Sequence, residues 1–319
     1  MAFMLGICLS LFVLSLVISC PLVGWLIGRA RKRGQMDEPG TEAHKKHEHA
    51  VPNIGGIGIF AATAGPLTAA LVAGWIISPD RWSGYLAPIG EHISGLRSVT
   101  PMGLALIGAL TAMHIMGRID DRRRLSAGIK LAVQLLVAAV LVCGFDMRVL
   151  HLLDGYGPGG VVLSMVISVL WICVVTNAMN MLDNMDGLSA GVGAVIAGMY
   201  LAATIIGGQW FVAALSAMLL GALLGFLVFN FPPAKVFMGD GGSLVMGMLL
   251  AIISIRTTYF NSHDPVAPGV WYGLAMPLMV MAVPLYDFVS VTLIRLSQGN
   301  SPFVGDRNHF SHRLVRKGL

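Results

Sequence analysis

Long apolar runs separated by short polar segments dominate this 319-residue chain. Each run is close to the roughly 20 residues that a helix needs to cross the hydrocarbon core of a bilayer. The runs are continuous and do not alternate between apolar and polar positions, which favours helices over a membrane barrel. We therefore predict an all-α polytopic membrane bundle in which Pro277 and Pro284 kink the last helix. The nine predicted spans are 4–28, 54–77, 101–117, 127–145, 160–178, 188–206, 209–229, 243–257 and 270–295.

The composition agrees with this pattern. Hydrophobic residues make up 56% of the chain and charged residues only 12%, against about 25% charged in a soluble domain. We predict a single integral-membrane domain over 1–319, because no repeat, low-complexity tract or polar domain interrupts the runs. The first apolar run is longer than the core of a cleaved signal peptide. The four cysteines lie in apolar spans outside any CxxC pattern, which favours inert thiols over metal ligands.

The positive charges predict the orientation. With the segment after the first span placed inside, 17 of the 21 Lys and Arg fall in inside segments, as the positive-inside rule requires. Only Arg81, Arg97, Arg148 and Arg256 fall outside. We therefore predict an outside N-terminus and a cytoplasmic position for every polar motif.

Five aspartates occur in three of these predicted cytoplasmic segments, 118–130, 176–187 and 230–242: Asp120, Asp121, Asp183, Asp186 and Asp240. Carboxylates gathered at one membrane face repel each other unless a cation joins them, and a hard cation held by a few carboxylates is a common means of binding a diphosphate. Asp120 and Asp121 could instead belong to a headgroup anchor, since arginines flank them. Asp183 and Asp186 share a face if their segment is helical, and their loop lacks the closing Glu of an EF-hand.

Other polar residues have two readings each. Glycines around Asp240 allow close approach of a phosphate, although Asp240 could also cap a helix. Lys130 could bind an anion or extend to the membrane interface. Asp287 lies inside a predicted span, where an acid is either functional or paired with a neighbouring helix. The terminal His309 and His312, with Arg313, suit anion contacts and proton transfer, or form a solvated basic tail.

Five motifs in order carry a resemblance to a known family. They are PNIGG (52–56), DD with LSAGIK (120–130), NMLDNMDG (180–187), VFMGDGGS (236–243) and DRNHFSHR (306–313). Together they resemble the polyprenyl-phosphate N-acetylhexosamine-1-phosphate transferases over nearly the whole chain. The DRxHxxHR tail is more similar to the bacterial undecaprenyl-phosphate GlcNAc-1-phosphate transferases than to the muramoyl-pentapeptide branch, which stays as the alternative.

The resemblance implies a reaction and assigns residues to it. A sugar 1-phosphate, most simply GlcNAc 1-phosphate, would pass from a UDP-sugar to undecaprenyl phosphate or a similar lipid, releasing UMP in the first membrane step of cell-envelope polysaccharide synthesis. It also implies a location in the bacterial inner membrane. The implied cofactor is Mg²⁺, with Mn²⁺ as an alternative; no nucleic acid is implied, and a homodimer is left open. The implied catalytic and metal-binding residues are Asp120, Asp121 and Asp240. The implied substrate-binding residues are Asn180, Asp183 and Asp186 at the nucleotide, Phe237 at uracil, Lys130 at a phosphate, and His309, His312 and Arg313 at the sugar-nucleotide phosphates.

Two departures from the family and one rival class accompany this interpretation. Ser311 stands where the family often has a histidine, and relatives usually carry at least one more span, so we expect this chain to lack a C-terminal helix. A cation-coupled transporter would also place acids in kinked spans. It predicts acids near the midplane and repeat symmetry, whereas here only Asp287 is deep and no half is duplicated.

Overall fold

The computed structural model describes residues 1–34, 51–77, 87–257, 270–299, 301, 309–316 and 318. The described part is helical, apart from one isolated bridge between Asn53 and Phe237. Eight helices within these described ranges are long and apolar enough to cross a membrane, so the predicted polytopic helical bundle is confirmed. These eight are α1 (Ala2–Arg33), α2 (Gly55–Ile76), α4 (Thr100–Asp120), α5 (Ala127–Phe145), α6 (Pro158–Leu182), α7 (Leu188–Ile206), α8 (Trp210–Asn230) and α9 (Asp240–Thr257).

The ninth predicted span, 270–295, is broken into two helices. Helix α10 (Val270–Val280) and helix α11 (Ala282–Ser297) meet at Met281. Pro284 has no backbone N–H and so cannot donate to the carbonyl four residues before it, while the Met281 N–H still donates to Pro277 O at 2.9 Å. The break next to Pro284 agrees with the predicted kink there, whereas Pro277 lies inside α10 without ending it. The break explains why eight of the described helices rather than nine are long enough to span.

Three short helical segments were not predicted. Helix α3 (Ala87–Ser98) precedes α4, the 3₁₀ turn η3 (His151–Tyr156) joins α5 to α6, and α12 (Phe310–Arg316) lies in the C-terminal motif. All three fall in segments whose polar, Gly- and Pro-containing sequence gives no apolar run of spanning length. Short helices of this kind depend on neighbouring elements more than on their own periodicity.

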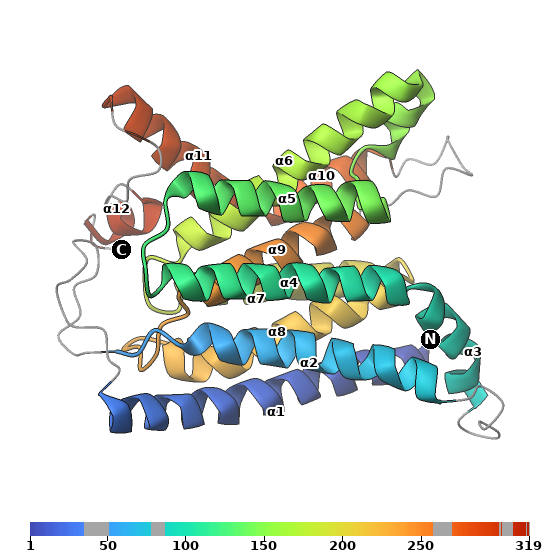
Figure 1. Ribbon diagram of the computed structural model, residues 1–319, viewed down its shortest axis with the longest axis horizontal. Helices are drawn as coiled ribbons and strands as arrows, with labels where there is room; N and C mark the ends of the chain where they lie inside the picture. The colour runs from blue at the N-terminus through green and yellow to red at the C-terminus, as the bar shows by residue number, and fades with distance from the viewer. Residues whose placement is uncertain are drawn as a thin grey trace.

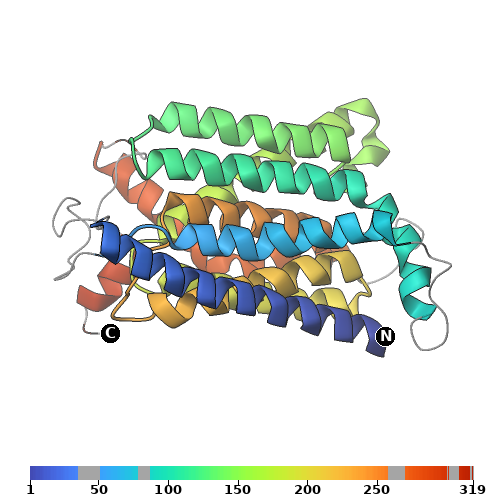
Figure 2. The same cartoon turned by 60° about the horizontal axis from the view of Figure 1, so that its bottom comes forward.

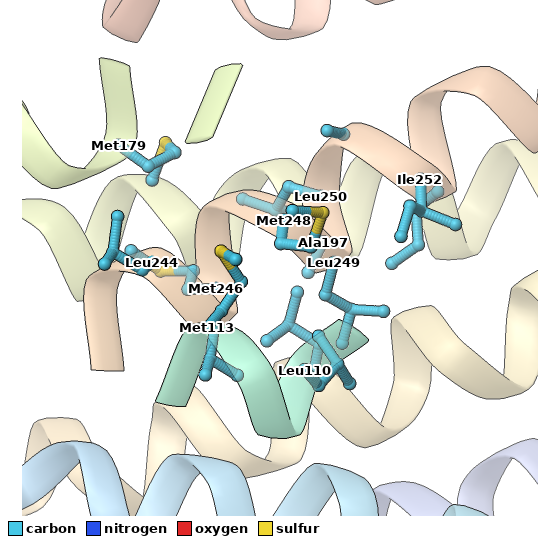
Figure 3. Close-up of a cluster of buried hydrophobic side chains, with 14 of the residues drawn as sticks. Leu110, Met113, Met179, Ala197, Leu244, Met246, Met248, Leu249, Leu250 and Ile252 are labelled. Carbon is cyan, nitrogen blue, oxygen red and sulfur yellow. The ribbon is translucent and has the colours of Figure 1, made fainter. Parts of the chain in front are cut away.

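Helix α9 forms the centre of the bundle (Figure 1). Its residues from Gly241 to Ile255 are all buried, and the helices around it are α2, α4, α6, α7 and α8. A helix that is apolar on every side must be enclosed by other helices to be buried in this way. Figure 3 shows Met246 and Leu249 of α9 among Leu110 and Met113 of α4.

Glycines allow the backbone of α9 to approach two neighbouring helices closely. A Cβ atom at Gly56 of α2 would lie 2.7 Å from Gly242 Cα and 2.8 Å from the carbonyl carbon of Gly241. A Cβ atom at Gly247 would lie 2.8 Å from Thr176 Cα of α6. Small residues at such crossings are the usual way in which membrane helices pack closely.

The polar motifs gather at one end of the bundle. In both views α1, α4, α6 and α8 finish at the end where α2, α5, α7 and α9 begin, with α12 beside them (Figures 1 and 2). We call this the motif end, formed by residues 51–56, 117–130, 180–188, 230–243 and 309–316. The helices α3 and η3 lie at the opposite end (Figure 1). The antiparallel path of the chain therefore brings all five of the predicted acidic residues to the same end.

Candidate active site

Four side chains from four helices meet at the motif end. Lys130 Nζ of α5 lies 2.6 Å from Asp120 Oδ2 of α4 and 3.4 Å from Asp240 Oδ2 of α9. Asn180 Nδ2 of α6 donates to Asp240 Oδ1 at 2.9 Å. The side chains of Lys130 and Asp240 are each 28% exposed, whereas that of Asp120 is 10% exposed. We call these four residues the acid–lysine cluster, and its exposure leaves it open to a substrate.

The local sequence positions the first two members of the cluster. Asp120 ends α4, and its Oδ1 accepts a hydrogen bond of 2.6 Å from Leu125 N, which closes the turn between α4 and α5. The side chain of Ser126 then caps α5 by accepting from Ile129 N, as N-cap serines do. Lys130 follows in the first turn of α5, close enough to reach back to Asp120.

Asp240 is held at the first residue of α9. It follows Gly239, which has a φ of +68°, a conformation that glycine adopts without steric cost. Ser243 lies one turn further along α9, and Asn180 Nδ2 donates to its Oγ at 2.8 Å. Asn180 therefore connects the end of α6 to two positions of α9. Its hydrogen bond to Oδ1 of Asp240 leaves Oδ2 facing Lys130.

Asp121 has a different environment from its neighbour Asp120. Its oxygens accept hydrogen bonds from four donors: Asp240 N at 2.8 Å, Gly241 N at 3.4 Å, Arg118 Nη1 at 3.3 Å and Asn53 Nδ2 at 3.3 Å. Its side chain is 7% exposed. Burial raises the pKa of the Asp121 carboxyl, while the two backbone N–H groups and the Arg118 guanidinium act to lower it. Asp121 stabilises the start of α9 by accepting its first N–H groups. Its predicted role at a metal stays a prediction.

The segment after α6 forms a turn rather than a continued helix. Asp183 is the C-cap of α6, which ends at Leu182, so the argument that Asp183 and Asp186 share one helical face does not apply. Asp186 Oδ2 accepts a hydrogen bond of 2.9 Å from Ala234 N. Asp186 therefore ties this turn to the segment before α9, and its predicted contact with a nucleotide stays a prediction, as does that of Asp183.

Phe237 belongs to a pairing that the sequence did not reveal. Its N–H donates to Pro52 O at 3.0 Å, and its carbonyl accepts from Gly55 N at 2.9 Å. The motifs PNIGG and VFMGDGGS therefore lie side by side, with Asn53 reaching Asp121. Phe237 is half-buried, and its predicted stacking on uracil stays a prediction.

The C-terminal residues of the motif DRNHFSHR contact α11. His309 Nδ1 lies 2.7 Å from Asp287 Oδ2, and Arg313 Nη2 donates to Ser290 Oγ at 3.3 Å. The rings of His309 and His312 meet edge to face with centroids 6.3 Å apart. The side-chain hydrogen bonds that His309 and Arg313 make within the described ranges run to α11, so the structure does not join these two residues to the acid–lysine cluster. Residues 306–308 lie outside the described residues.

Two further polar side chains at the site were missed. Arg118 Nη1 donates to Asn53 O at 2.7 Å, and His114 Nδ1 lies 2.8 Å from Gly241 O while its ring stacks on Phe60. Arg118 was read only as part of a charge cluster. His114 lies inside a span, where an ionisable residue is itself a signal of function or of a specific partner.

The donor set of the acid–lysine cluster is compatible with Mg²⁺. Among the residues that the structure describes, no group of three or more His, Cys, Asp or Glu is arranged to hold a metal. Mg²⁺ is commonly held by only one or two carboxylates together with substrate phosphates and water. Asp120 and Asp240 provide such a pair, and the ammonium of Lys130 lies between them where a cation is favoured. These two carboxylates are thus the residues that fit a metal.

Comparisons with known proteins agree with the motif pattern. The family model of glycosyl transferase family 4 matches residues 103–258. A probable undecaprenyl-phosphate N-acetylglucosaminyl 1-phosphate transferase of Bacillus subtilis is 30% identical over 96% of this chain and 76% of its own length. The decaprenyl-phosphate N-acetylglucosaminephosphotransferase of Mycobacterium tuberculosis is 33% identical over 85% of this chain and 67% of its own length. An Escherichia coli undecaprenyl-phosphate alpha-N-acetylglucosaminyl 1-phosphate transferase is 30% identical over 91% of this chain and 71% of its own. The matched region 103–258 contains all four residues of the acid–lysine cluster.

Proposed function

This chain belongs to glycosyl transferase family 4, and on that premise we propose that it transfers N-acetylglucosamine 1-phosphate to a polyprenyl phosphate. Relatives of the chain that share most of its length are named for this transfer. The observation that carries the proposal is the acid–lysine cluster, in which Lys130 lies within 3.4 Å of two carboxylates from distant parts of the chain.

The proposed donor is UDP-GlcNAc, and the proposed acceptor is undecaprenyl phosphate or a similar lipid. An oxygen of the lipid phosphate forms a bond to the sugar-linked phosphorus of the donor, and the bond from that phosphorus to UMP breaks. The products are a lipid diphosphate that carries GlcNAc, and UMP. An acceptor phosphate floats at the headgroup plane, so a site at the end of a helical bundle can meet it without a separate soluble domain.

The residues of the cluster divide this work between positioning and charge compensation. The Lys130 ammonium, held by Asp120 and Asp240, offers a positive charge to a phosphate, and such preorganised charge is the main source of rate in phosphoryl transfer. Asp120 and Asp240 would hold Mg²⁺ or Mn²⁺, whose chemistry here is neutralisation of the charge on the diphosphate. Asn180 fixes the orientation of Asp240 through its hydrogen bond.

The motif end is proposed to face the cytoplasm of a bacterial cell across the inner membrane. The excess of Lys and Arg in its segments supports this orientation. UDP-sugars are cytoplasmic metabolites, so a cytoplasmic site would also meet its donor directly. Asp287, the one deep acid that favoured a transporter, is occupied by a hydrogen bond with His309.

A turnover assay on the full chain tests the proposal. The purified protein is supplied with radiolabelled UDP-GlcNAc, undecaprenyl phosphate and Mg²⁺, and the release of UMP and the formation of labelled lipid are measured. We expect both products, and we expect EDTA or Asp240→Asn to lower turnover at least about 100-fold, since the substitution removes a charge at the reacting phosphates. Turnover that survives EDTA and the substitution would overturn the metal assignment.

Asp146→Asn is the matched control for that assay. Asp146 follows α5 at the end opposite Lys130 and has a φ of +51°, a conformation that asparagine tolerates. The substitution weakens the ion pair of the exposed Asp146 with Arg148, but pairs with an exposed partner contribute little and this one lies at the other end of the bundle, so turnover should stay within about 2-fold of the wild type. In proteoliposomes, ion-driven uptake without UMP release would favour a transporter and contradict the proposed function.

A further inference from the structure

A carboxylate that the proposed reaction does not use is buried in α11. Asp287 is 0% exposed, and an ionised carboxylate is costly to bury unless donors surround it. Both of its oxygens have such donors, and both donors come from the C-terminal segment. His309 Nδ1 lies 2.7 Å from Oδ2, and Phe310 N donates to Oδ1 at 2.8 Å. The buried acid is thus paired with a segment that is 22 and 23 residues away in the chain.

The pairing determines which ring nitrogen of His309 carries a proton. An ionised carboxylate can only accept hydrogen bonds, so the nitrogen facing it, Nδ1, must be the donor. The ring of His309 is 6% exposed, and its Nε2 makes no hydrogen bond with any residue that the structure describes. A carboxylate behind a histidine fixes the tautomer and the direction of the ring in this way in other enzymes. Nε2 is therefore the edge left for a ligand.

The C-terminal segment also contacts the motif NMLDNMDG (180–187). Ser311 Oγ donates to Asn184 Oδ1 at 2.8 Å, and Asn184 Nδ2 donates to Met181 O at 3.0 Å. Because Asn184 lies four residues after Asn180, these contacts tie α12 to the loop that leads directly from the acid–lysine cluster. Helix α12 is thus held between α11 on one side and the 180–187 motif on the other.

We propose that Asp287 is a positioning residue for the transfer reaction, which acts by holding His309 with Nδ1 protonated and Nε2 directed to a phosphate of the substrate. The inference rests on the proposed function for the identity of that phosphate. Asp287 does not touch the substrate, since it is buried behind the histidine. The contribution of Asp287 to kcat/KM therefore depends on the His309 imidazole. A purely structural acid would make the same contribution whether or not His309 is present.

Kinetics of a double-mutant cycle test this dependence. We compare kcat and KM for UDP-GlcNAc in the wild type, D287N, H309Q and the double variant. Removal of a carboxylate behind a functional histidine typically costs about 10- to 100-fold, so we expect each single variant to lose that much kcat/KM. The double variant should lie within about 3-fold of H309Q, because contacts that act through one residue are not additive. If D287N lowers kcat/KM by the same factor in the wild-type and H309Q backgrounds, the proposal is overturned.

Ser290→Ala is the matched control in the same helix. Ser290 lies one turn after Asp287 and accepts a hydrogen bond from Arg313 of α12 at 3.3 Å. Its loss removes another contact between α11 and α12 without changing the histidine. We expect S290A to lose clearly less kcat/KM than D287N, because it removes a single long, part-buried hydrogen bond to Arg313 and leaves the contacts of His309 in place. A loss as large as that of D287N would show that any weakening of the α11–α12 contact suffices, and would contradict the proposal.

A spectroscopic measurement makes the test independent of activity. In protein carrying ¹⁵N-labelled histidine, the His309 signals are identified by their absence in H309Q. We expect wild type to show a ring protonated at Nδ1, and D287N to show the Nε2–H tautomer, since the asparagine amide can donate to Nδ1. A wild-type ring protonated only at Nε2 would overturn the proposal, even if D287N cannot be purified in a folded form. If wild type releases no UMP, the proposed function fails, while this spectrum still decides the Asp287–His309 arrangement.

Discussion

Two adjacent aspartates at the motif end have separate roles that are decided by their contacts. Asp120 is bound to the ammonium of Lys130 and faces Asp240, whereas Asp121 accepts the backbone N–H groups at the start of α9. A carboxylate at a helix N-terminus is favoured by the exposed N–H groups and the dipole. Asp121 therefore fixes the position of Asp240, and Asp120 contributes to the chemistry at Lys130.

Substitution to asparagine should separate the two aspartates. Asp120→Asn should lower kcat at least about 100-fold, because its charge acts on the substrate, and should also cost some stability because it weakens the ion pair with Lys130. Asp121→Asn should destabilise the fold by about 1–3 kcal/mol, the typical cost of losing charged hydrogen bonds. Turnover assays and melting curves in detergent measure both effects. A folded Asp121→Asn protein that loses as much kcat as Asp120→Asn would contradict this division.

Lys130 should compete with a divalent cation for the two carboxylates that flank it. Lys130→Met leaves Asp120 and Asp240 without their shared counter-charge, which favours binding of another cation. We expect kcat to fall at least about 100-fold and Mg²⁺ to raise the melting temperature more in the variant than in wild type. A melting temperature that does not respond to Mg²⁺ in either protein would show that these carboxylates do not bind the ion.

At the scale of elements, the close packing of α2 on α9 determines where Asp240 lies. Gly56 N donates to Met238 O at 3.0 Å, and the glycine lies against the backbone of Gly241 and Gly242. The PNIGG motif thus acts through backbone contact, with no side chain at its glycines to touch a substrate. The motif contains no acid or base, and it affects the site because its glycines let α2 pack closely on the start of α9.

Gly56→Ala should disturb both stability and turnover. The added Cβ would lie within 2.8 Å of backbone atoms of α9, and overpacking of this kind costs about 1–3 kcal/mol. Asp240 begins α9, so we expect kcat to fall together with the melting temperature. Gly65→Ala in the same helix is the control, because nothing lies within 4 Å of its added Cβ and alanine favours a helix. Equal effects of the two substitutions would contradict the close-packing argument.

At the scale of the whole molecule, the antiparallel path of the helices separates two polar ends. The motif end holds the acid–lysine cluster. The opposite end holds a network in which Arg148 pairs with Asp146 and Asp154. The Arg148 guanidinium holds the pKa of Asp154 below its usual range. This network connects the end of α5 to η3 and stabilises the connection between them.

Cysteine labelling tests the orientation of the two ends. In a background without the four native cysteines, Gly155→Cys reports on η3 and Lys235→Cys reports on the exposed segment before α9. An impermeant maleimide should label Gly155→Cys in intact cells and should label Lys235→Cys only after permeabilisation, as the distribution of Lys and Arg requires. The reverse pattern would place the acid–lysine cluster outside the cytoplasm and contradict the proposed use of a cytoplasmic donor.

The sequence by itself determined the membrane class, eight of the spans, the break near Pro284 and the gathering of the acids at one end. These follow from hydropathy, from the missing N–H of proline and from an antiparallel count of spans, all of which are local or additive properties. Only the tertiary structure decided that Asp120 and Asp121 differ, that the 52–56 and 237–238 segments pair, and that Asp287 holds His309. Such contacts join residues far apart in the chain, from 22 positions for Asp287 and His309 to 185 for Pro52 and Phe237. Their geometry depends on how helices cross, which the spacing of residues along one chain does not specify.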